Sequence, residues 1–167
     1  MPDHRVAAVA NEFLDRAQRE GISLTNMQLQ KLPYIAYGWN LALRHERLIS
    51  CSPQAWKYGP VYPELYEKLK RYGATQVTGF IHENDDNPYA DRRGEVIREP
   101  FTLGETELLN TVWEAYKQYN GFALSVMTHR QGTPWTKTFR DGAGNGETIP
   151  DTLIEQHYVE LANATPG

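Results

Sequence analysis

One stretch of the sequence, residues 25–44, constrains the fold more than any other. Its apolar side chains recur with alternating gaps of three and four residues: Leu29, Leu32, Ala36, Trp39 and Leu43. This spacing places them along one face of an α-helix. Thr25 with Gln28 forms a capping-box pattern, which satisfies backbone N–H groups at a helix start. The stretch therefore predicts a long helix, kinked or starting late because Pro33 removes one backbone hydrogen bond.

The rest of the chain continues the helical spacing. Further helices are predicted over residues 4–20, 63–72, 103–119, 122–129, 134–140 and 150–162. Residues 76–82 and 95–101 are β-prone and flank a polar, turn-rich stretch, which predicts one short hairpin over about residues 76–101. Residues 47–62 are expected to form an irregular connection. No repeat or long linker divides the chain. The predicted fold is therefore mainly α, a compact single-domain bundle of about six to eight helices.

Charge and composition exclude several classes of protein. The 167 residues include 21 acidic and 17 basic ones, which gives a net charge of −4. Proteins that mainly bind nucleic acid usually carry net positive charge, because phosphate neutralisation supplies most of the affinity. The charge therefore argues against nucleic acid as the partner. There is no apolar run long enough to span a bilayer, and acidic residues interrupt the N-terminal stretch where a signal peptide would need apolar ones. Cys51 is the single cysteine, which agrees with a reducing compartment, so we expect a cytoplasmic protein.

Patterns for metal binding and catalysis are weak. The five histidines have no partner histidine at a metal-binding spacing, so neither a metal site nor a cofactor is expected. Ser125 and His129 would share one face of a helix. A catalytic base needs a third group to orient it, and the sequence identifies none. We therefore expect no enzyme activity, and a small hydrolase with His129 as its base is kept as an alternative.

Residues 55–63 (AWKYGPVYP) carry the most informative pattern for binding. Trp56 and Tyr58 flank Lys57, and Gly59-Pro60 forms a corner of the backbone. Tyrosine and tryptophan supply a large contact area at small entropic cost, which is typical of recognition surfaces. Because large aromatic side chains are usually buried, Trp56 itself is expected in the core.

Three separate segments together resemble the Panacea antitoxin domain. Residues 25–39 (TNMQLQKLPYIAYGW) resemble its LQKLLY…W helix, and residues 55–66 are similar to its AWxYGPVxPxxY signature. Residues 128–129 (TH) with residues 134–135 (PW) match its LTH…PW element. The order and spacing hold over about residues 6–158, which is nearly the whole chain.

The resemblance implies one SocA-like domain over residues 1–167 that neutralises a cognate toxin, commonly encoded beside it, by direct protein contact. The family includes phage-associated GepA-like proteins and SocA-type antitoxins, and the latter also act as adaptors that deliver the toxin to the ClpXP protease. Two features depart from the family pattern, namely Pro33 in place of leucine and the acidic insert at residues 85–93. Either would change the choice of partner if the toxin contacts it.

The predicted function is therefore that of an antitoxin. Its candidate partner-binding residues lie near the Gly-Pro corner and the Thr-His element: Lys57, Tyr58, Gly59, Pro60, Tyr62, Arg71, Thr128, His129 and Arg130. The expected structural core includes Leu29, Leu32, Trp39, Trp56, Trp113 and Trp135. A second alternative is a transcriptional regulator that uses the first two helices as a helix-turn-helix, with Gln28, Gln30 and Lys31 facing DNA.

Overall fold

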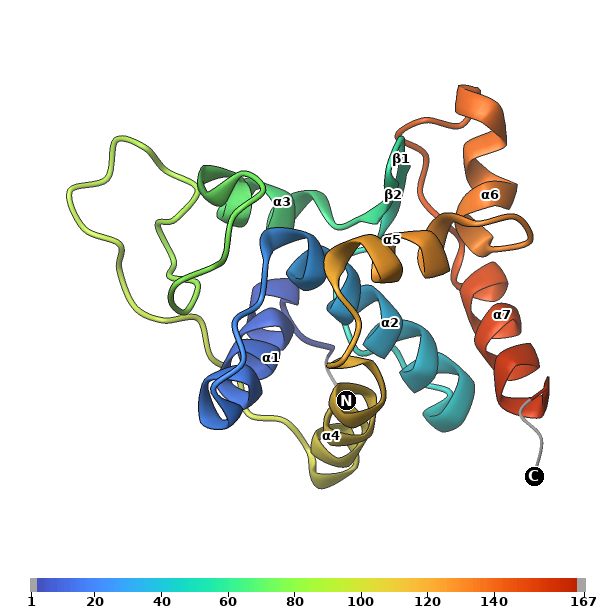
Figure 1. Ribbon diagram of the computed structural model, residues 1–167, viewed down its shortest axis with the longest axis horizontal. Helices are drawn as coiled ribbons and strands as arrows, with labels where there is room; N and C mark the ends of the chain where they lie inside the picture. The colour runs from blue at the N-terminus through green and yellow to red at the C-terminus, as the bar shows by residue number, and fades with distance from the viewer. Residues whose placement is uncertain (1–2, 165–167) are drawn as a thin grey trace.

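The computed structural model describes residues 3–164 and shows a helical bundle with one small antiparallel sheet (Figure 1). Its elements are α1 (Val6–Glu20), α2 (Asn26–Arg44), β1 (Gln54–Trp56), β2 (Gly59–Val61), α3 (Pro63–Leu69), α4 (Leu103–Tyr116), α5 (Gly121–His129), α6 (Pro134–Phe139) and α7 (Asp151–Ala164). Two short 3₁₀ turns, Lys70–Tyr72 and Arg140–Gly142, follow α3 and α6. The prediction of a mainly α fold is confirmed. None of the described helices is long and apolar enough to cross a membrane.

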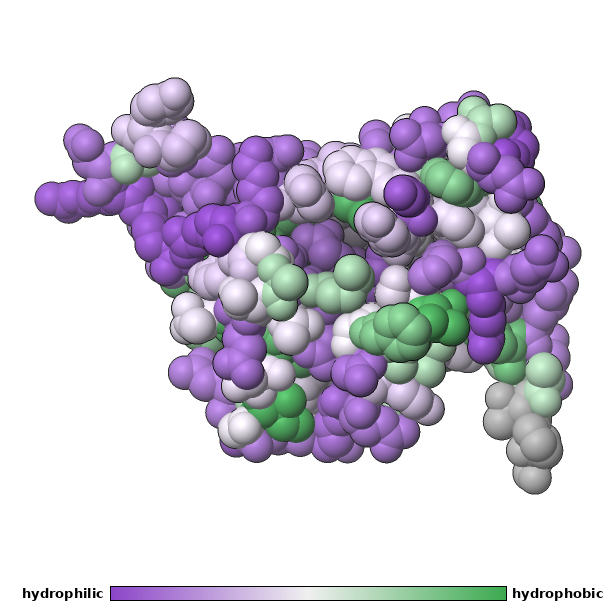
Figure 2. Space-filling view, turned by 45° about the horizontal axis from the view of Figure 1, so that its top comes forward, coloured by the Kyte–Doolittle hydropathy of each residue, from purple (hydrophilic) through white to green (hydrophobic). Residues whose placement is uncertain are grey.

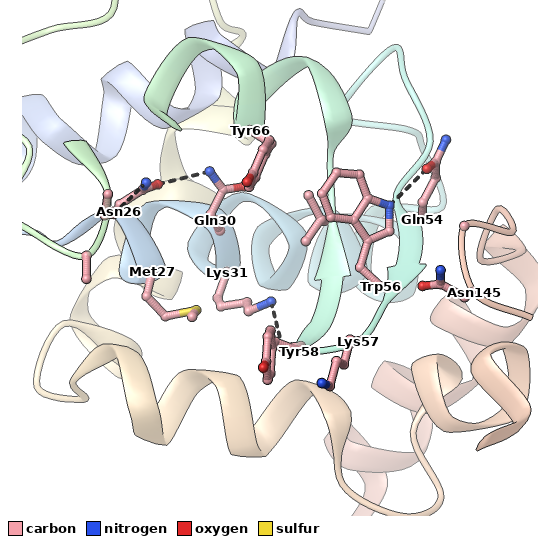
Figure 3. A pocket seen from close by; sticks show the side chains of 14 residues that line it. Asn26, Met27, Gln30, Lys31, Gln54, Trp56, Lys57, Tyr58, Tyr66 and Asn145 are labelled. Atoms are coloured by element: carbon pink, nitrogen blue, oxygen red, sulfur yellow. Dashed lines mark hydrogen bonds between the residues drawn. The ribbon is translucent and has the colours of Figure 1, made fainter. Parts of the chain in front are cut away.

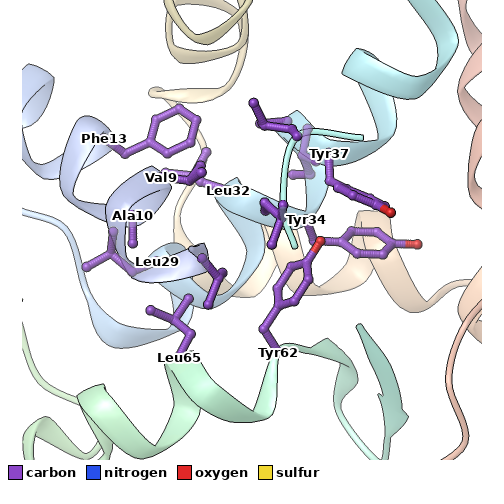
Figure 4. Packing of buried hydrophobic residues seen from close by; sticks show 14 of the residues in the cluster. Val9, Ala10, Phe13, Leu29, Leu32, Tyr34, Tyr37, Tyr62 and Leu65 are labelled. Atoms are coloured by element: carbon purple, nitrogen blue, oxygen red, sulfur yellow. The ribbon is translucent and has the colours of Figure 1, made fainter. Parts of the chain in front are cut away.

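Helix α2 lies in the middle of the bundle and packs against α1, α4, α5 and α7. Its start follows from the sequence, because the Thr25 hydroxyl accepts the Gln28 N–H and the Gln28 side chain accepts the Thr25 N–H. The helix does not start late: it begins at Asn26 and continues through Pro33. Figure 4 shows Leu29 and Leu32 of α2 in one layer with Val9, Ala10 and Phe13 of α1, where the apolar side chains of both helices are removed from water.

The tryptophans differ in burial. Trp113 and Trp135 are buried, whereas Trp39 and Trp56 keep part of their surface exposed. The indole N–H of Trp39 donates to the Tyr116 hydroxyl over 3.0 Å, so this residue closes the edge of the bundle. Trp39 is half-buried and packs against the core, as predicted, whereas Trp56 is half-buried and lies outside the buried cluster.

The hairpin lies in a different place from the predicted one. Strands β1 and β2 pair with Ala55 opposite Pro60, inside the segment expected to be irregular. Residues 76–101 instead form a long irregular segment that extends to one side of the bundle, with a single β-bridge between His82 and Val96. The physical reason is a buried side chain of α1. The Asn11 amide donates to the carbonyls of Ile81 and Ile97 and accepts the Ile81 N–H, so it takes over bonds that a strand ladder would use.

Candidate partner-binding cavity

A cavity of about 770 Å³ lies between the start of α2, the β1–β2 hairpin and α3 (Figure 3). Its size falls within the range of ligand pockets, roughly 300 to 1,000 Å³. The walls come from segments far apart in the sequence: Asn26, Met27, Gln30, Lys31, Gln54, Trp56, Lys57, Tyr58, Val61, Tyr66, Gly73, Ala74, Asn145 and Gly146.

The corner of the hairpin is fixed from below by Lys31 of α2. The Lys31 ammonium donates to the carbonyl oxygen of Tyr58 over 3.3 Å and to that of Pro60 over 2.9 Å. Between them Gly59 has φ +118°, and a Cβ atom at this position would lie 2.9 Å from the Lys31 nitrogen. Only glycine fits this close approach without strain. The backbone of residues 58–60 therefore folds closely around the buried Lys31 side chain.

The outer edge of β1 is covered by the segment that follows α6. Gly146 N–H donates to the Ala55 carbonyl over 2.7 Å, and Ala55 N–H donates to the Glu147 carbonyl over 2.9 Å. Ile149 N–H donates in the same way to the Pro53 carbonyl. These bonds occupy backbone groups that an edge strand would otherwise leave open, so the segment braces the hairpin.

The Lys31 ammonium is buried without a countercharge. Its side chain is 1% exposed, and among residues 3–164 no carboxylate lies within 4 Å of it. Burial lowers the pKa of Lys31 to about 7, because the charged form loses its hydration. An ammonium has three N–H donors, and the two carbonyls of the hairpin accept only two of them.

A short chain of side-chain amides ends at the cavity floor. Asn26 donates to the carbonyls of Leu69 and Gly73, and its own oxygen accepts a hydrogen bond from the Gln30 amide. The remaining Gln30 oxygen is buried and has no partner in the described structure. A buried acceptor without a donor costs free energy, so this atom is a candidate contact for a bound group.

Aromatic side chains form the wall and rim above this floor. The Trp56 ring packs against Tyr66 at 5.1 Å between centroids, and its indole N–H donates to the Gln54 side chain. Tyr58 is 64% exposed, with the Lys57 ammonium 5.4 Å from its ring. These aromatic groups lie at the surface of the cavity, where they can contact a partner.

An apolar surface continues from the cavity onto α5. Phe122, which is 78% exposed, and Val126 lie one turn apart on this helix. The start of α5 packs on Met27 of the cavity wall, since a Cβ atom at Gly121 would lie 2.8 Å from the Met27 Cβ. Figure 2 shows green apolar side chains together in the middle of this face. Contiguous exposed apolar residues of this kind mark interaction sites.

The Ser125–His129 pair has a structural arrangement. Ser125 Oγ lies 3.1 Å from the Tyr58 carbonyl, to which it donates, and 3.2 Å from His129 Nδ1. Since the hydroxyl proton goes to the carbonyl, His129 does not take it as a base would. His129 packs edge-on against Trp135 at 5.3 Å. The pair thus ties α5 to the hairpin, and the geometry does not support the hydrolase alternative.

The structure brings together some of the predicted contact residues and separates others. Lys57 and Tyr58 are exposed at the corner formed by Gly59 and Pro60, and His129 lies against Gly59 with Arg130 exposed beside it. Three predicted contact residues lie elsewhere: Tyr62, Thr128 and Arg71.

Tyr62 and Thr128 are buried, which contradicts their prediction as contacts, whereas the exposed Arg71 stays a predicted contact outside the cavity. Tyr62 is fully buried with its ring 6.3 Å from that of Tyr37, and the Thr128 hydroxyl donates to carbonyls within α5. Neither can contact a partner in this fold. Arg71 lies 3.7 Å from Asp85 of the acidic insert, outside the cavity.

The helix-turn-helix alternative is wrong for a related reason. Gln28, Gln30 and Lys31, the residues that would face DNA, are all buried in α2. A recognition helix must present such side chains to the major groove.

Sequence reasoning did not identify Lys31 and Gln30 as parts of the candidate site. A signal for Lys31 exists, because it is the one charged residue of α2 before Arg44. When a lone lysine of a largely apolar helix is buried, it is expected to be engaged by a partner. The contribution of Asn145 and Gly146 depends on the tertiary fold and has no such signal. No group of three or more His, Cys, Asp or Glu side chains within residues 3–164 could hold a metal ion.

Comparison with known families identifies the class of this helical domain. The model of the family described as "Antitoxin SocA-like, Panacea domain" matches residues 29–136, from α2 into α6, and the chain belongs to this family. Among curated proteins the chain is similar to antitoxin SocA of Caulobacter vibrioides (strain NA1000 / CB15N). The two are 28% identical over 155 residues, which cover 90% of this chain and 80% of that protein. No solved structure matches the chain.

Proposed function

We propose that this protein is an antitoxin that neutralises a cognate toxin in the cytoplasm by binding it directly. The contact surface in this proposal is the cavity together with the exposed apolar face of α5. One observation carries it: in this member of a family described as SocA-like antitoxins, the cavity combines the exposed Tyr58 ring with a buried Gln30 oxygen that has no partner among the described residues. Such a surface gains stability when another molecule covers it.

The surface also has the character that tight protein–protein contacts need. Stable complexes bury about 1,600 Å² in total, and a few aromatic or arginine anchors supply most of the energy. Trp56 and Tyr58, which line the cavity, and the exposed Phe122 of α5 are the proposed anchors. Binding alone would occlude the toxin, and delivery to the ClpXP protease would build on the same contact.

Co-expression with the product of the adjacent reading frame tests the proposal. We expect the wild-type chain to restore growth and to co-elute with the toxin in size-exclusion chromatography. Phe122→Asp should abolish both effects, because it places a charge in the apolar contact. Leu103→Asp is the matched control, since Leu103 is 75% exposed at the start of α4. A toxin that stays lethal beside the folded wild-type protein, or a Phe122→Asp variant that still protects, would reject the proposal.

Inhibition in a purified system separates occlusion from delivery. We expect the chain to inhibit the purified toxin at about one-to-one stoichiometry with no protease present. If inhibition needs ClpXP, the direct-occlusion part of the proposal is wrong.

A further inference from the structure

We infer that the part of the toxin that enters the cavity is an acidic segment of its polypeptide carrying an aromatic or large apolar side chain. This inference rests on the proposed function and specifies the chemistry of the partner.

The charge of the cavity supports an anionic occupant. Its lining contains two lysines, Lys31 and Lys57, and no aspartate or glutamate. The whole chain, in contrast, has more acidic than basic residues. A positive cavity in a negative protein favours a partner segment of negative charge and disfavours a basic one.

The distribution of unpaired cations supports the same conclusion. Within the described part of the chain, most lysines and arginines have a carboxylate within 4 Å. The exceptions are Lys31, Lys57, Arg92, Arg130 and Lys137. Lys31 and Lys57 line the cavity, and Arg130 directly follows His129, which lies against the hairpin. Arg92 lies on the acidic insert and therefore serves as a control.

The unused hydrogen-bonding groups specify a polypeptide. The third Lys31 donor lacks an acceptor, and the buried Gln30 oxygen lacks a donor. An acidic peptide supplies both, because its carboxylate accepts and its backbone N–H donates. Trp56 and Tyr66 provide the apolar wall for its aromatic side chain.

Short peptides test this chemistry directly on the full chain. The probes are four acetylated and amidated pentapeptides: EDFED, the neutral QNFQN, the basic KRFKR and EDAED without the aromatic ring. Titrations followed by NMR should show EDFED shifting the Trp56 indole and Lys57 amide signals, with an affinity at least tenfold higher than that of the other three. Added salt should weaken this binding, because screening reduces charge attraction.

Charge reversal extends the test to the toxin. Lys57→Glu should reduce EDFED binding and toxin affinity at least fivefold, whereas Arg92→Glu should leave both within twofold. Equal binding of EDFED and QNFQN, no binding of EDFED, or binding of ATP in its place would overturn the inference. Lys57→Glu with unchanged toxin affinity would do the same. The proposed function is judged separately, by whether the wild-type chain protects cells, so either idea can fail alone.

Discussion

Two buried lysines, Lys68 on α3 and Lys31 on α2, have opposite surroundings. Lys68 donates to the Asp86 carboxylate over 2.9 Å and to the Glu83 carbonyl, so its charge is neutralised within the chain. Lys31 has two carbonyl partners and no carboxylate within 4 Å among the described residues. Removing a buried charge from water is costly unless a partner compensates it. The charge of Lys68 is therefore compensated within the chain, whereas the charge of Lys31 has no compensating carboxylate among the described residues.

Asp85 and Glu83, in the same region as Lys68, follow its pattern. Asp85 accepts hydrogen bonds from Arg93 over 2.7 Å and from the His82 backbone over 2.8 Å. Burial raises the pKa of Asp85, but these bonds outweigh it and hold the pKa below its ordinary value. Glu83 pairs with Arg5 of the region before α1. These acidic groups are therefore paired within the chain, whereas the cavity floor keeps the Gln30 oxygen without a partner among the described residues.

The largest expected difference between the Lys31 and Lys68 regions is in how the free energy of unfolding depends on pH. The pKa of Lys31 is about 7 in the folded protein and 10.5 as its ordinary value. Between these values the unfolded chain binds one more proton, so the free energy of unfolding rises with pH, by about 1.4 kcal/mol per unit. In urea unfolding, the wild type should therefore gain roughly 2 to 3 kcal/mol relative to Lys31→Met between pH 7 and 9.

Lys68→Met is the matched control for this measurement. It retains Lys31, so its stability should rise with pH as steeply as that of the wild type. Parallel pH profiles for the wild type and Lys31→Met would show that the Lys31 charge is compensated after all.

The second largest effect concerns toxin affinity. Trp56→Ala should weaken binding about 100-fold, the loss typical of a buried aromatic anchor. Tyr89→Ala on the acidic insert should change affinity less than twofold, although Tyr89 is 92% exposed. Isothermal titration calorimetry measures both, and circular dichroism checks that each variant folds. A comparable loss for Tyr89→Ala would place the insert in the interface and break the comparison.

The smallest effect concerns one glycine in each region. Gly59 has φ +118° and Gly94 has φ +80°, so alanine is strained at both, by about 1 to 3 kcal/mol. An added methyl group at Gly59 also meets the Lys31 nitrogen, whereas at Gly94 it meets the flexible Asn84 side chain. Gly59→Ala should therefore weaken toxin binding several-fold, and Gly94→Ala should lower stability without changing affinity. Equal toxin affinities for the two variants would mean that toxin binding does not depend on the shape of the hairpin corner.

Local rules were sufficient to predict the helical framework. The Thr25 and Thr102 capping boxes and the proline at the first position of α3 start helices as expected. The position of the hairpin could not be predicted in this way, because it depends on contacts distant in sequence. Asn11 disrupts one candidate ladder, and residues 146–149 brace the other.

The candidate site was predicted only in part, for a geometric reason. The aromatic corner at residues 55–63 was identified, and Tyr58 is indeed at the surface. Tyr62 lies only four residues away but points into the core, because the chain turns into α3 at this position. Composition does not show in which direction an aromatic side chain points. The cavity floor formed by Lys31 and Gln30 could be recognised only from the three-dimensional structure.

The cavity walls have a consequence for the life of the molecule in the cell. Asn26 and Gly146 border the same cavity, although 120 positions of the chain separate them. A nascent chain acquires this surface only after the later segment has emerged from the ribosome and docked on β1. A single cut that releases either segment removes the surface again. Under the proposed function, only intact, folded copies protect the cell.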